Sequence, residues 1–255
     1  MRVLVTGSEG FVGAHLRSLL AAKGHVVISS SHKQPKHATN EAGPCVQLDL
    51  PCDDQAKAVL ADSHPDVVVH LAAMAAVGDC EQNPEQAYQA NVEGTASLVR
   101  AMAASCPKAR LIFVSSSNVY GPADAKYQPI PEELGRAPVN VYAWTKRAAE
   151  AWIHAHAFLL EKPATIIRQF NQVGPGQSSL YALPGFAKQI VQIERGELEP
   201  VVRVGNLKVR RDIMDVRDVV KAYAEIIETP QITGCYNICS GEASMLSDLL
   251  DRMAA

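Results

Sequence analysis

The chain has 255 residues, 47% hydrophobic and 20% charged, with a formal net charge of −3, which is enough for one large domain or one domain with a small lobe. Lysines and arginines are scattered, no apolar run reaches the roughly 18 residues of a membrane helix, and the apolar run after Met1 is too short for a signal peptide. We therefore expect a cytoplasmic protein without a nucleic-acid or membrane partner, and the six cysteines, which form no CxxC pair, predict no metal site.

Segments typical of β-strands alternate with segments of helical spacing through the first part of the chain. The strand-like segments are continuously apolar, which is typical of a parallel sheet covered by helices on both faces. The sequence therefore predicts an α/β fold with a doubly wound parallel sheet. The expected strands are 2–6, 25–29, 45–48, 67–71, 110–114 and 165–168, and the expected helices between them are 11–22, 54–61, 84–105 and 141–160.

The pattern loosens after residue 170, where Gly174, Pro175, Gly176 and Pro184 interrupt it. We expect a cofactor-binding domain over 1–169 and a small substrate lobe over 170–255, interleaved with the last strand of the sheet. The expected elements of this part are helices at 185–196, 216–228 and 244–253 and strands at 201–204 and 235–238.

A glycine-rich turn, TGSEGFVG, separates the first strand from the first helix. Gly7 permits a tight turn, Gly10 lets a pyrophosphate approach the backbone, and Gly13 lets the helix pack closely on the strand. This order of strand, glycine turn and helix predicts a dinucleotide site.

The end of the second strand indicates which dinucleotide is bound. An NAD site usually carries an acid there for the ribose 2′-hydroxyl. This sequence has ISSSHK at 28–33 instead, and the hydroxyls of Ser29, Ser30 and Ser31, with His32 and Lys33, suit a 2′-phosphate better. We expect NADP, with NAD as the alternative. Asp49 either accepts a hydrogen bond from the adenine amino group or is the N-terminal acid of the next helix.

Tyr142 and Lys146 lie four residues apart in VYAWTKR, which places them on one face of a helix. A tyrosine with a pKa near 10 needs about 4 kcal/mol of stabilisation to ionise near neutral pH. A nearby ammonium and the positive ring of an oxidised nicotinamide supply such stabilisation. The pair therefore predicts general acid/base chemistry.

Six motifs together resemble the extended short-chain dehydrogenase/reductases, which are nucleotide-sugar epimerases, dehydratases and reductases. Segments 186–223 and 236–241 are also similar to the GDP-4-keto-6-deoxymannose reductases. The resemblance implies a Rossmann-like fold, a nicotinamide cofactor, a nucleotide-sugar substrate and a homodimer formed through helices 84–105 and 141–160. The motifs are GxxGxxG at 7–13, HLAA at 70–73, NVEGT at 91–95, SSSNVYG at 115–121, YAWTK at 142–146 and RQFNQVGPGQ at 168–177.

The resemblance also implies individual roles. The catalytic residues would be Ser116, with Ser117 as its substitute, Tyr142 and Lys146, the last two also touching the cofactor. Lys188 would be either a nucleotide ligand or a solvated helix lysine. Further cofactor residues would be Phe11, Val12, Leu50, Leu71, Ala72, Ala73 and Asn91. Substrate residues would be Ser116, Asn118, Asn171, Lys188 and Arg211.

The residues after Ser116 bear on the reaction. Dehydratases of this family carry an acid just after the catalytic serine or threonine, where this chain has Ser117 and Asn118. An amide has no titratable proton near neutral pH, so dehydration is not expected. The sequence favours NADPH-dependent reduction of the C4 keto group of a nucleotide-linked 6-deoxy sugar. The alternatives are an NAD-dependent nucleotide-sugar 4-epimerase and a non-catalytic, NADP-binding redox-sensing regulator. Because the family usually continues past the position of Ala255, we expect a shortened lobe.

Overall fold

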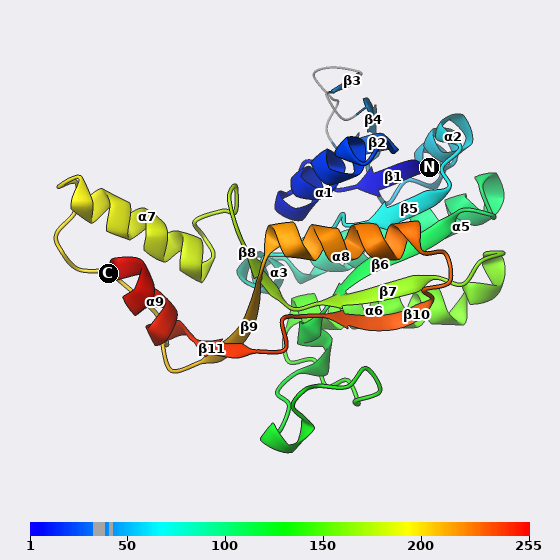
Figure 1. Ribbon diagram of the computed structural model, residues 1–255. Helices are drawn as coiled ribbons and strands as arrows, with labels where there is room; N and C mark the ends of the chain where they lie inside the picture. The colour runs from blue at the N-terminus through cyan, green and yellow to red at the C-terminus, as the bar shows by residue number, and fades with distance from the viewer. Residues whose placement is uncertain (33–38, 41–42) are drawn as a thin grey trace. The chain divides into compact units, whose positions relative to one another are not determined.

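The computed structural model describes residues 1–32, 39–40 and 43–255. Its main feature is an 8-stranded sheet with the order β10-β7-β6-β5-β1-β2-β4-β3, shown in Figure 1. All neighbouring strands are parallel except β3 and β4, so the predicted doubly wound parallel sheet is confirmed. The strands are β1 (Arg2–Thr6), β2 (Val26–Ser31), β3 (Thr39–Asn40), β4 (Gly43–Gln47), β5 (Val67–His70), β6 (Arg110–Ser116), β7 (Thr165–Gln169) and β10 (Gly234–Ile238).

The central strands are apolar along their length because helices cover both faces of the sheet. One face belongs to a core cluster that includes Leu4 of β1 and Phe113 of β6. On that face pack α2 (Asp53–Ser63), α5 (Gly94–Ser105) and α6 (Val141–Ala155). Buried residues of α1 (Phe11–Ala22) and α8 (Val216–Glu228) lie outside this cluster, and Figure 1 shows α8 in front of the sheet.

The predicted helix 84–105 is helical throughout but is not uniform. It consists of α4 (Pro84–Tyr88), a π-helical turn (Gln89–Glu93) and α5, and it follows the short α3 (Val77–Gln82). The predicted helix 141–160 ends as an α-helix at Ala155 and is followed by a 3₁₀ turn (Ala157–Leu159). Such π-turns frequently mark functional positions, and this one contains Asn91.

The chain divides into two units. The first contains Met1–Gln169 and Val220–Ile238, and the second contains Phe170–Val219 and Cys239–Ala255. The last strand of the main sheet, β10, thus belongs to the first unit although it follows much of the second in sequence. That the second unit binds substrate stays a prediction.

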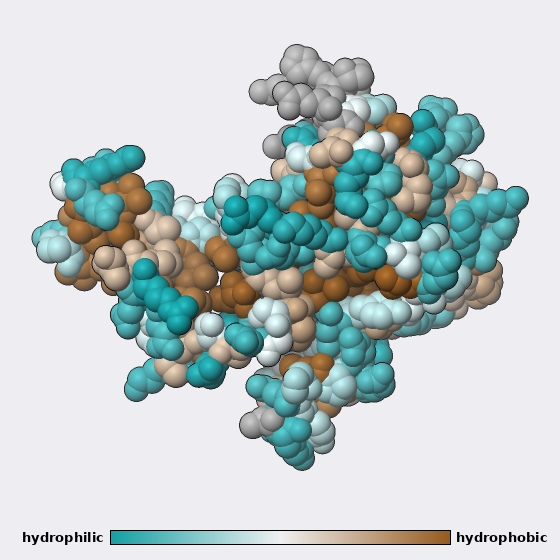
Figure 2. Space-filling model, viewed as in Figure 1, coloured by the Kyte–Doolittle hydropathy of each residue, from teal (hydrophilic) through white to brown (hydrophobic). Residues whose placement is uncertain are grey.

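The second unit has its own three-stranded sheet of β8 (Asn171–Val173), β9 (Arg210–Asp215) and β11 (Ala243–Met245), in the order β11-β9-β8. Its helices are α7 (Ala182–Glu194) and α9 (Leu246–Ala254), and Figure 2 shows hydrophobic residues gathered over them. The predicted helix 244–253 begins at Leu246 because 243–245 pair with β9.

The predicted strand 201–204 is wrong. These residues are irregular, and Val201 is 61% exposed. The side-chain amide of Gln189 bonds to both the backbone N–H and the carbonyl oxygen of Arg203, at 2.8 and 3.1 Å, in the way a neighbouring strand would. The apolar run therefore has no strand partner. No helix in the described part of the chain is long and apolar enough to cross a membrane.

Candidate active site

The glycine turn lies where the strand order of the main sheet reverses. β1 pairs with β2 on one side and with β5 on the other, and ligands of such sheets bind at the carboxyl ends of the strands at this point. Gly7 has a φ of 68°, and a Cβ there would lie 2.8 Å from the backbone nitrogen of Ala72. The turn is therefore packed directly on the chain that leaves β5, where the predicted cofactor residues Leu71, Ala72 and Ala73 lie.

The other two glycines shape the start of α1. A Cβ on Gly13 would collide with the carbonyl oxygen of Gly7, so only glycine fits. Gly10 is the N-cap of α1 and donates a 3.0 Å hydrogen bond to the same oxygen. The helix has no side-chain cap and no acid in its first turn, which leaves N–H groups for an anion. This cradle fits the pyrophosphate of a dinucleotide, with Phe11 and Val12 in the first turn of the helix.

Asn91 links the loop after β5 to α6. Its side chain accepts from the backbone N–H of Met74 at 2.8 Å and donates to Thr145 Oγ1 at 2.9 Å, and it is 1% exposed. Thr145 Oγ1 in turn donates to the carbonyl oxygen of Tyr142 at 2.8 Å. The amide predicted to touch cofactor is therefore engaged by the protein, where it holds the loop after β5 against the tyrosine-bearing helix.

The residues predicted to hold a 2′-phosphate lie at the end of β2, except Lys33, which is outside the described residues. Ser30 and Ser31 are buried, whereas His32 is exposed. The hydroxyl of Ser31 donates to Glu9 Oε2 at 2.7 Å. Glu9, in the glycine turn, was not among the predicted site residues, because only the folded chain brings it to β2.

Asp49 is exposed, and its backbone N–H donates to Gln55 Oε1 at 2.7 Å. Helix α2 begins at Asp53, and its first-turn acids are Asp53 and Asp54. Asp49 is thus not the N-terminal acid of that helix, and its contact with adenine stays a prediction. Leu50 packs against the core cluster beside it.

Lys146 connects α6 to the end of β6. Its Nζ donates a 2.8 Å hydrogen bond to the carbonyl oxygen of Val114 and lies 4.9 Å from the ring centre of Phe113. The residue is 3% exposed, and this burial lowers the pKa of Lys146 to about 8, although the charge of Glu150 opposes the shift. Tyr142, one turn earlier on the same helix, is half-buried.

The strand pleat separates the candidate serines. Ser115 is buried and donates its hydroxyl to Glu150, so it faces the interior. Ser116 ends β6, is 8% exposed, and accepts a 3.2 Å hydrogen bond from the backbone N–H of Asn118. Ser117 is partly buried and starts a 3₁₀ turn (Ser117–Tyr120), and Asn118 is exposed in that turn. Alternation along the strand thus favours Ser116 over Ser115, and Ser117 remains its substitute.

A buried charged network lies behind these serines, and sequence patterns did not indicate it. Glu150 is fully buried and accepts hydrogen bonds from Arg168 Nη2 at 2.8 Å and Nε at 3.1 Å. Arg168 also donates to the hydroxyl of Tyr120 at 2.8 Å, and Tyr120 donates to Asn237. Because Ser115 bonds to Glu150, the network fixes the end of β6 from the side opposite Ser116.

The second unit holds the other predicted substrate residues. Asn171 begins β8, and its amide donates to the carbonyl oxygen of Asp212 on β9 at 3.0 Å. Arg211 is the neighbouring residue on β9 and is exposed. Lys188 is exposed on α7. The small sheet thus brings Asn171 and Arg211 together, and Lys188 lies on a separate element.

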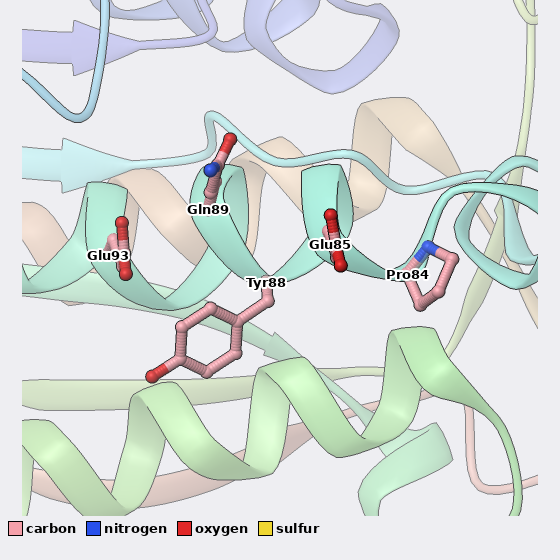
Figure 3. A pocket seen from close by; sticks show the side chains of 5 residues that line it. All are labelled: Pro84, Glu85, Tyr88, Gln89 and Glu93. Atoms are coloured by element: carbon pink, nitrogen blue, oxygen red, sulfur yellow. The ribbon is translucent and has the colours of Figure 1, made fainter.

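A hollow of about 350 Å³ lies on α4 and the π-helical turn after it, and none of the predicted site residues lines it. Figure 3 shows the ring of Tyr88 directed toward the neighbouring helix α6, while the glutamates and Gln89 project from other parts of the helix. Among the described residues no cluster of histidine, cysteine and acidic side chains could hold a metal ion. The hollow is lined by Pro84, Glu85, Tyr88, Gln89 and Glu93.

Comparison with known proteins assigns the chain to a family. Residues 3–239 match the model of the NAD dependent epimerase/dehydratase family. The chain is 31% identical to GDP-6-deoxy-D-mannose reductase from Pseudomonas aeruginosa, over 99% of this chain and 79% of the reductase.

Solved structures are similar over nearly the whole chain. RMD from Pseudomonas aeruginosa complexed with NADPH gives a TM-score of 0.80 at 31% identity, covering 98% of this chain and 80% of that one. The UDP-glucose 4-epimerase of Thermus thermophilus in complex with NAD gives a TM-score of 0.85 at 25% identity, and the match covers 100% of this chain and 82% of the epimerase chain. The predicted resemblance is thereby confirmed, and the chain belongs to the NAD dependent epimerase/dehydratase family.

Proposed function

We propose that the chain reduces the C4 keto group of a nucleotide-linked 6-deoxy sugar of the GDP-4-keto-6-deoxymannose type. The hydrogen bond from Lys146 Nζ to the carbonyl oxygen of Val114 carries this proposal. It fixes the helix that bears Tyr142 and Lys146 against the strand that ends in Ser116. This contact supports the proposal, because it ties the helix of Tyr142 to the strand that leads to Ser116.

Two of these residues act at the C4 oxygen, and the third acts on Tyr142 and on the cofactor. The bound nicotinamide cofactor supplies the hydride. Tyr142 donates its phenolic proton to the oxygen as negative charge develops there, and Ser116 donates a hydrogen bond to the same oxygen. The positive charge of Lys146 favours the tyrosinate that remains, and its ammonium holds the ribose of the cofactor.

Asn118 argues against dehydration. Its backbone N–H donates to the hydroxyl oxygen of Ser116, and its exposed side chain is an amide at the position where an acid would be required. An amide neither donates nor takes up a proton near neutral pH. Elimination of water from C5–C6 would therefore lack its acid, whereas hydride transfer at C4 needs none there.

The substrate handle is proposed from the second unit. Arg211 on β9 presents a guanidinium, whose planar donors suit a diphosphate, and Asn171 lies on the adjacent strand. Lys188 is a further candidate ligand for the nucleotide. The similarity to a GDP-6-deoxy-D-mannose reductase supports a GDP sugar.

A 4-epimerase is the second candidate function. Such an enzyme would use the same three residues with an NAD that is reduced and reoxidised in each cycle. The carboxylate of Glu9 at the end of β2 favours this reading, because an acid at that place suits NAD. A non-catalytic redox sensor is disfavoured, because it would not need Tyr142, Lys146 and Ser116 in this arrangement.

A homodimer through helices 84–105 and 141–160 is also proposed. Tyr88 and Trp144 are 50% and 54% exposed on these helices, and Tyr88 lines the hollow shown in Figure 3. Ala149, on the second of these helices, is fully buried in the core and so is not part of that exposed face. Light scattering should give a particle mass of twice the chain mass, and Trp144→Glu should reduce it to the mass of one chain.

A cytoplasmic location is proposed from the sequence alone.

The test of the reaction is to mix the protein with GDP-4-keto-6-deoxymannose and either NADPH or NADH. Loss of the reduced-nicotinamide absorbance, with formation of a GDP-6-deoxyhexose, is expected. A 4-epimerase would instead interconvert C4 epimers of a nucleotide sugar with no net change in cofactor. Cofactor binding without turnover of either kind would contradict both enzymatic proposals.

A further inference from the structure

The glycine turn places a carboxylate at the end of β2. Glu9 lies two residues after Gly7, and its Oε2 accepts a 2.7 Å hydrogen bond from Ser31, the last residue of β2. A second contact also holds the glycine turn against the end of β2, since the hydroxyl of Ser8 donates to the carbonyl oxygen of Ser30 at 3.0 Å. Glu9 itself is exposed, whereas Ser31 is 5% exposed. The carboxylate is therefore held by a buried partner while remaining open to a ligand.

The end of the second strand is where proteins with this kind of sheet distinguish NAD from NADP. In a doubly wound sheet the pyrophosphate lies at the N-terminus of the first helix, and the adenosine ribose lies at the end of the second strand. An acid there accepts a hydrogen bond from the 2′-hydroxyl of NAD. In this chain the acid comes from the glycine turn, and the hydroxyl of Ser31, which the sequence favours as a phosphate donor, is turned toward it.

Arg17 is a cation near this carboxylate, and it would attract a 2′-phosphate and so oppose a preference for NAD. Glu9 raises and Arg17 lowers the pKa of the Cys45 thiol, after the larger effect of burial, so both charges lie near β4. Arg17 belongs to α1, and Cys45 pairs with Ser29, which lies inside the sheet rather than at the end of β2. Glu9 is the group that accepts a hydrogen bond from the last residue of β2, and Arg17 is a cation close enough to act on the same thiol.

We infer that Glu9 selects NAD(H) over NADP(H), by accepting a hydrogen bond from the 2′-hydroxyl and repelling a 2′-phosphate. A phosphate monoester carries a charge of roughly −1.5 to −2 at neutral pH, and a like charge within hydrogen-bonding range disfavours it. The inference rests on the proposed function only in that the glycine turn binds a nicotinamide dinucleotide. It is independent of the sugar substrate.

Direct binding tests the inference without turnover. Dissociation constants for NADH and NADPH are measured by calorimetry on the full chain. We expect NADH to bind at least about tenfold more tightly, which corresponds to about 1.4 kcal/mol. Glu9→Gln keeps the size of the side chain and removes its charge, and it should bring the ratio of the two constants close to one. Glu161→Gln, the same change at an exposed position near the amino end of β7, should leave the ratio unchanged.

Salt gives a second readout, because like-charge repulsion is screened. Raising ionic strength from about 0.1 M to about 1 M shortens the screening length from about 10 Å to about 3 Å. The preference for NADH should narrow in the unaltered chain and change much less in Glu9→Gln. This difference separates repulsion by a charge from a change in the shape of the turn.

The outcomes distinguish the inference from the proposed function. Tighter binding of NADPH, or an unchanged ratio in Glu9→Gln, would overturn the inference and leave the reductase proposal in place. Binding of neither cofactor by a folded chain would overturn both. A preference for NADH that is lost in Glu9→Gln and kept in Glu161→Gln would establish Glu9 as the specificity residue.

Discussion

The Nζ atom of Lys146 lies 2.8 Å from the carbonyl oxygen of Val114, and this bond joins the helix of the candidate acid to the strand of the candidate serine. The lysine is 3% exposed, so its charge is held in an environment that favours the neutral amine. An ammonium kept under these conditions acts strongly on nearby ionisable groups, because little water screens it. The contact should therefore affect both the chemistry at Tyr142 and the stability of the fold.

Tyr142→Phe should reduce turnover by about 10²- to 10⁴-fold, because the phenolic proton has no replacement at the C4 oxygen. Cofactor affinity should be nearly unchanged, since the ring and the helix remain. Steady-state rates and cofactor titration on the same preparation measure both quantities. Tyr127→Phe, at an exposed tyrosine in a 3₁₀ turn, should leave both unchanged. A Tyr142→Phe variant that remains active would mean that another group donates the proton.

Lys146 should make the free energy of unfolding depend on pH above neutrality. Burial lowers the pKa of Lys146 from 10.5 to about 8, so between these values the folded chain binds fewer protons than the unfolded chain. Its contribution to stability therefore rises with pH across this window, by about 1.4 kcal/mol per unit at most. The difference between the unaltered chain and Lys146→Met isolates this contribution. The free energy of unfolding of the unaltered chain should rise relative to that of Lys146→Met between about pH 8 and about pH 10.5. A difference between the two free energies that does not change with pH would contradict the assigned burial effect.

Glu150→Gln should destabilise the fold by about 3–5 kcal/mol, because it leaves the guanidinium of Arg168 buried without its counter-charge. The matched surface change is Asp53→Asn, which breaks the exposed ion pair with Arg100 and should cost about 1 kcal/mol or less. Adding Arg168→Met to Glu150→Gln should recover part of the loss. Denaturant unfolding of the unaltered chain and these variants gives the values, and equal losses for the buried and exposed pairs would refute the network's role.

Gly13→Ala should weaken cofactor binding severely, because its Cβ would collide with the carbonyl oxygen of Gly7 and displace the turn. Gly78→Ala is the control, since a Cβ there meets no atom within 4 Å. It lies in the short helix α3 and should be neutral or slightly stabilising. Cofactor titration and thermal unfolding compare the two. Normal binding by Gly13→Ala would mean that the turn is not the cofactor cradle.

The sequence predicted the parts of the molecule that depend on local patterns. The β1–turn–α1 unit follows from apolar spacing and glycine positions, and helix α8 has the predicted bounds. Family and enzyme class were also predicted correctly, because the glycine turn, the serine turn and the Tyr142–Lys146 pair are short motifs. The three-residue strands β8 and β11 gave no such signal, since their pairing is set by β9 rather than by their own residues.

Residues defined by tertiary contacts were missed for the same reason. Glu150 looks like a helix glutamate in sequence, and its role appears only when Arg168 is brought beside it by strand β7. Glu9 looks like a polar turn residue until Ser31 of β2 is placed next to it. The residues predicted at the ribose end were therefore only those in and directly after the last part of β2. The fold supplies the acid from another segment.

A single-turnover measurement of reduced-cofactor consumption separates the proposed reductase from a protein that only binds dinucleotide. The protein is mixed with NADH or NADPH and GDP-4-keto-6-deoxymannose, in parallel with Tyr142→Phe. We expect one cofactor oxidised per sugar reduced at C4 by the unaltered chain, and none by the variant despite retained cofactor binding. Measurable cofactor binding with no oxidation by the unaltered chain, on this or related keto sugars, would contradict the proposed reduction.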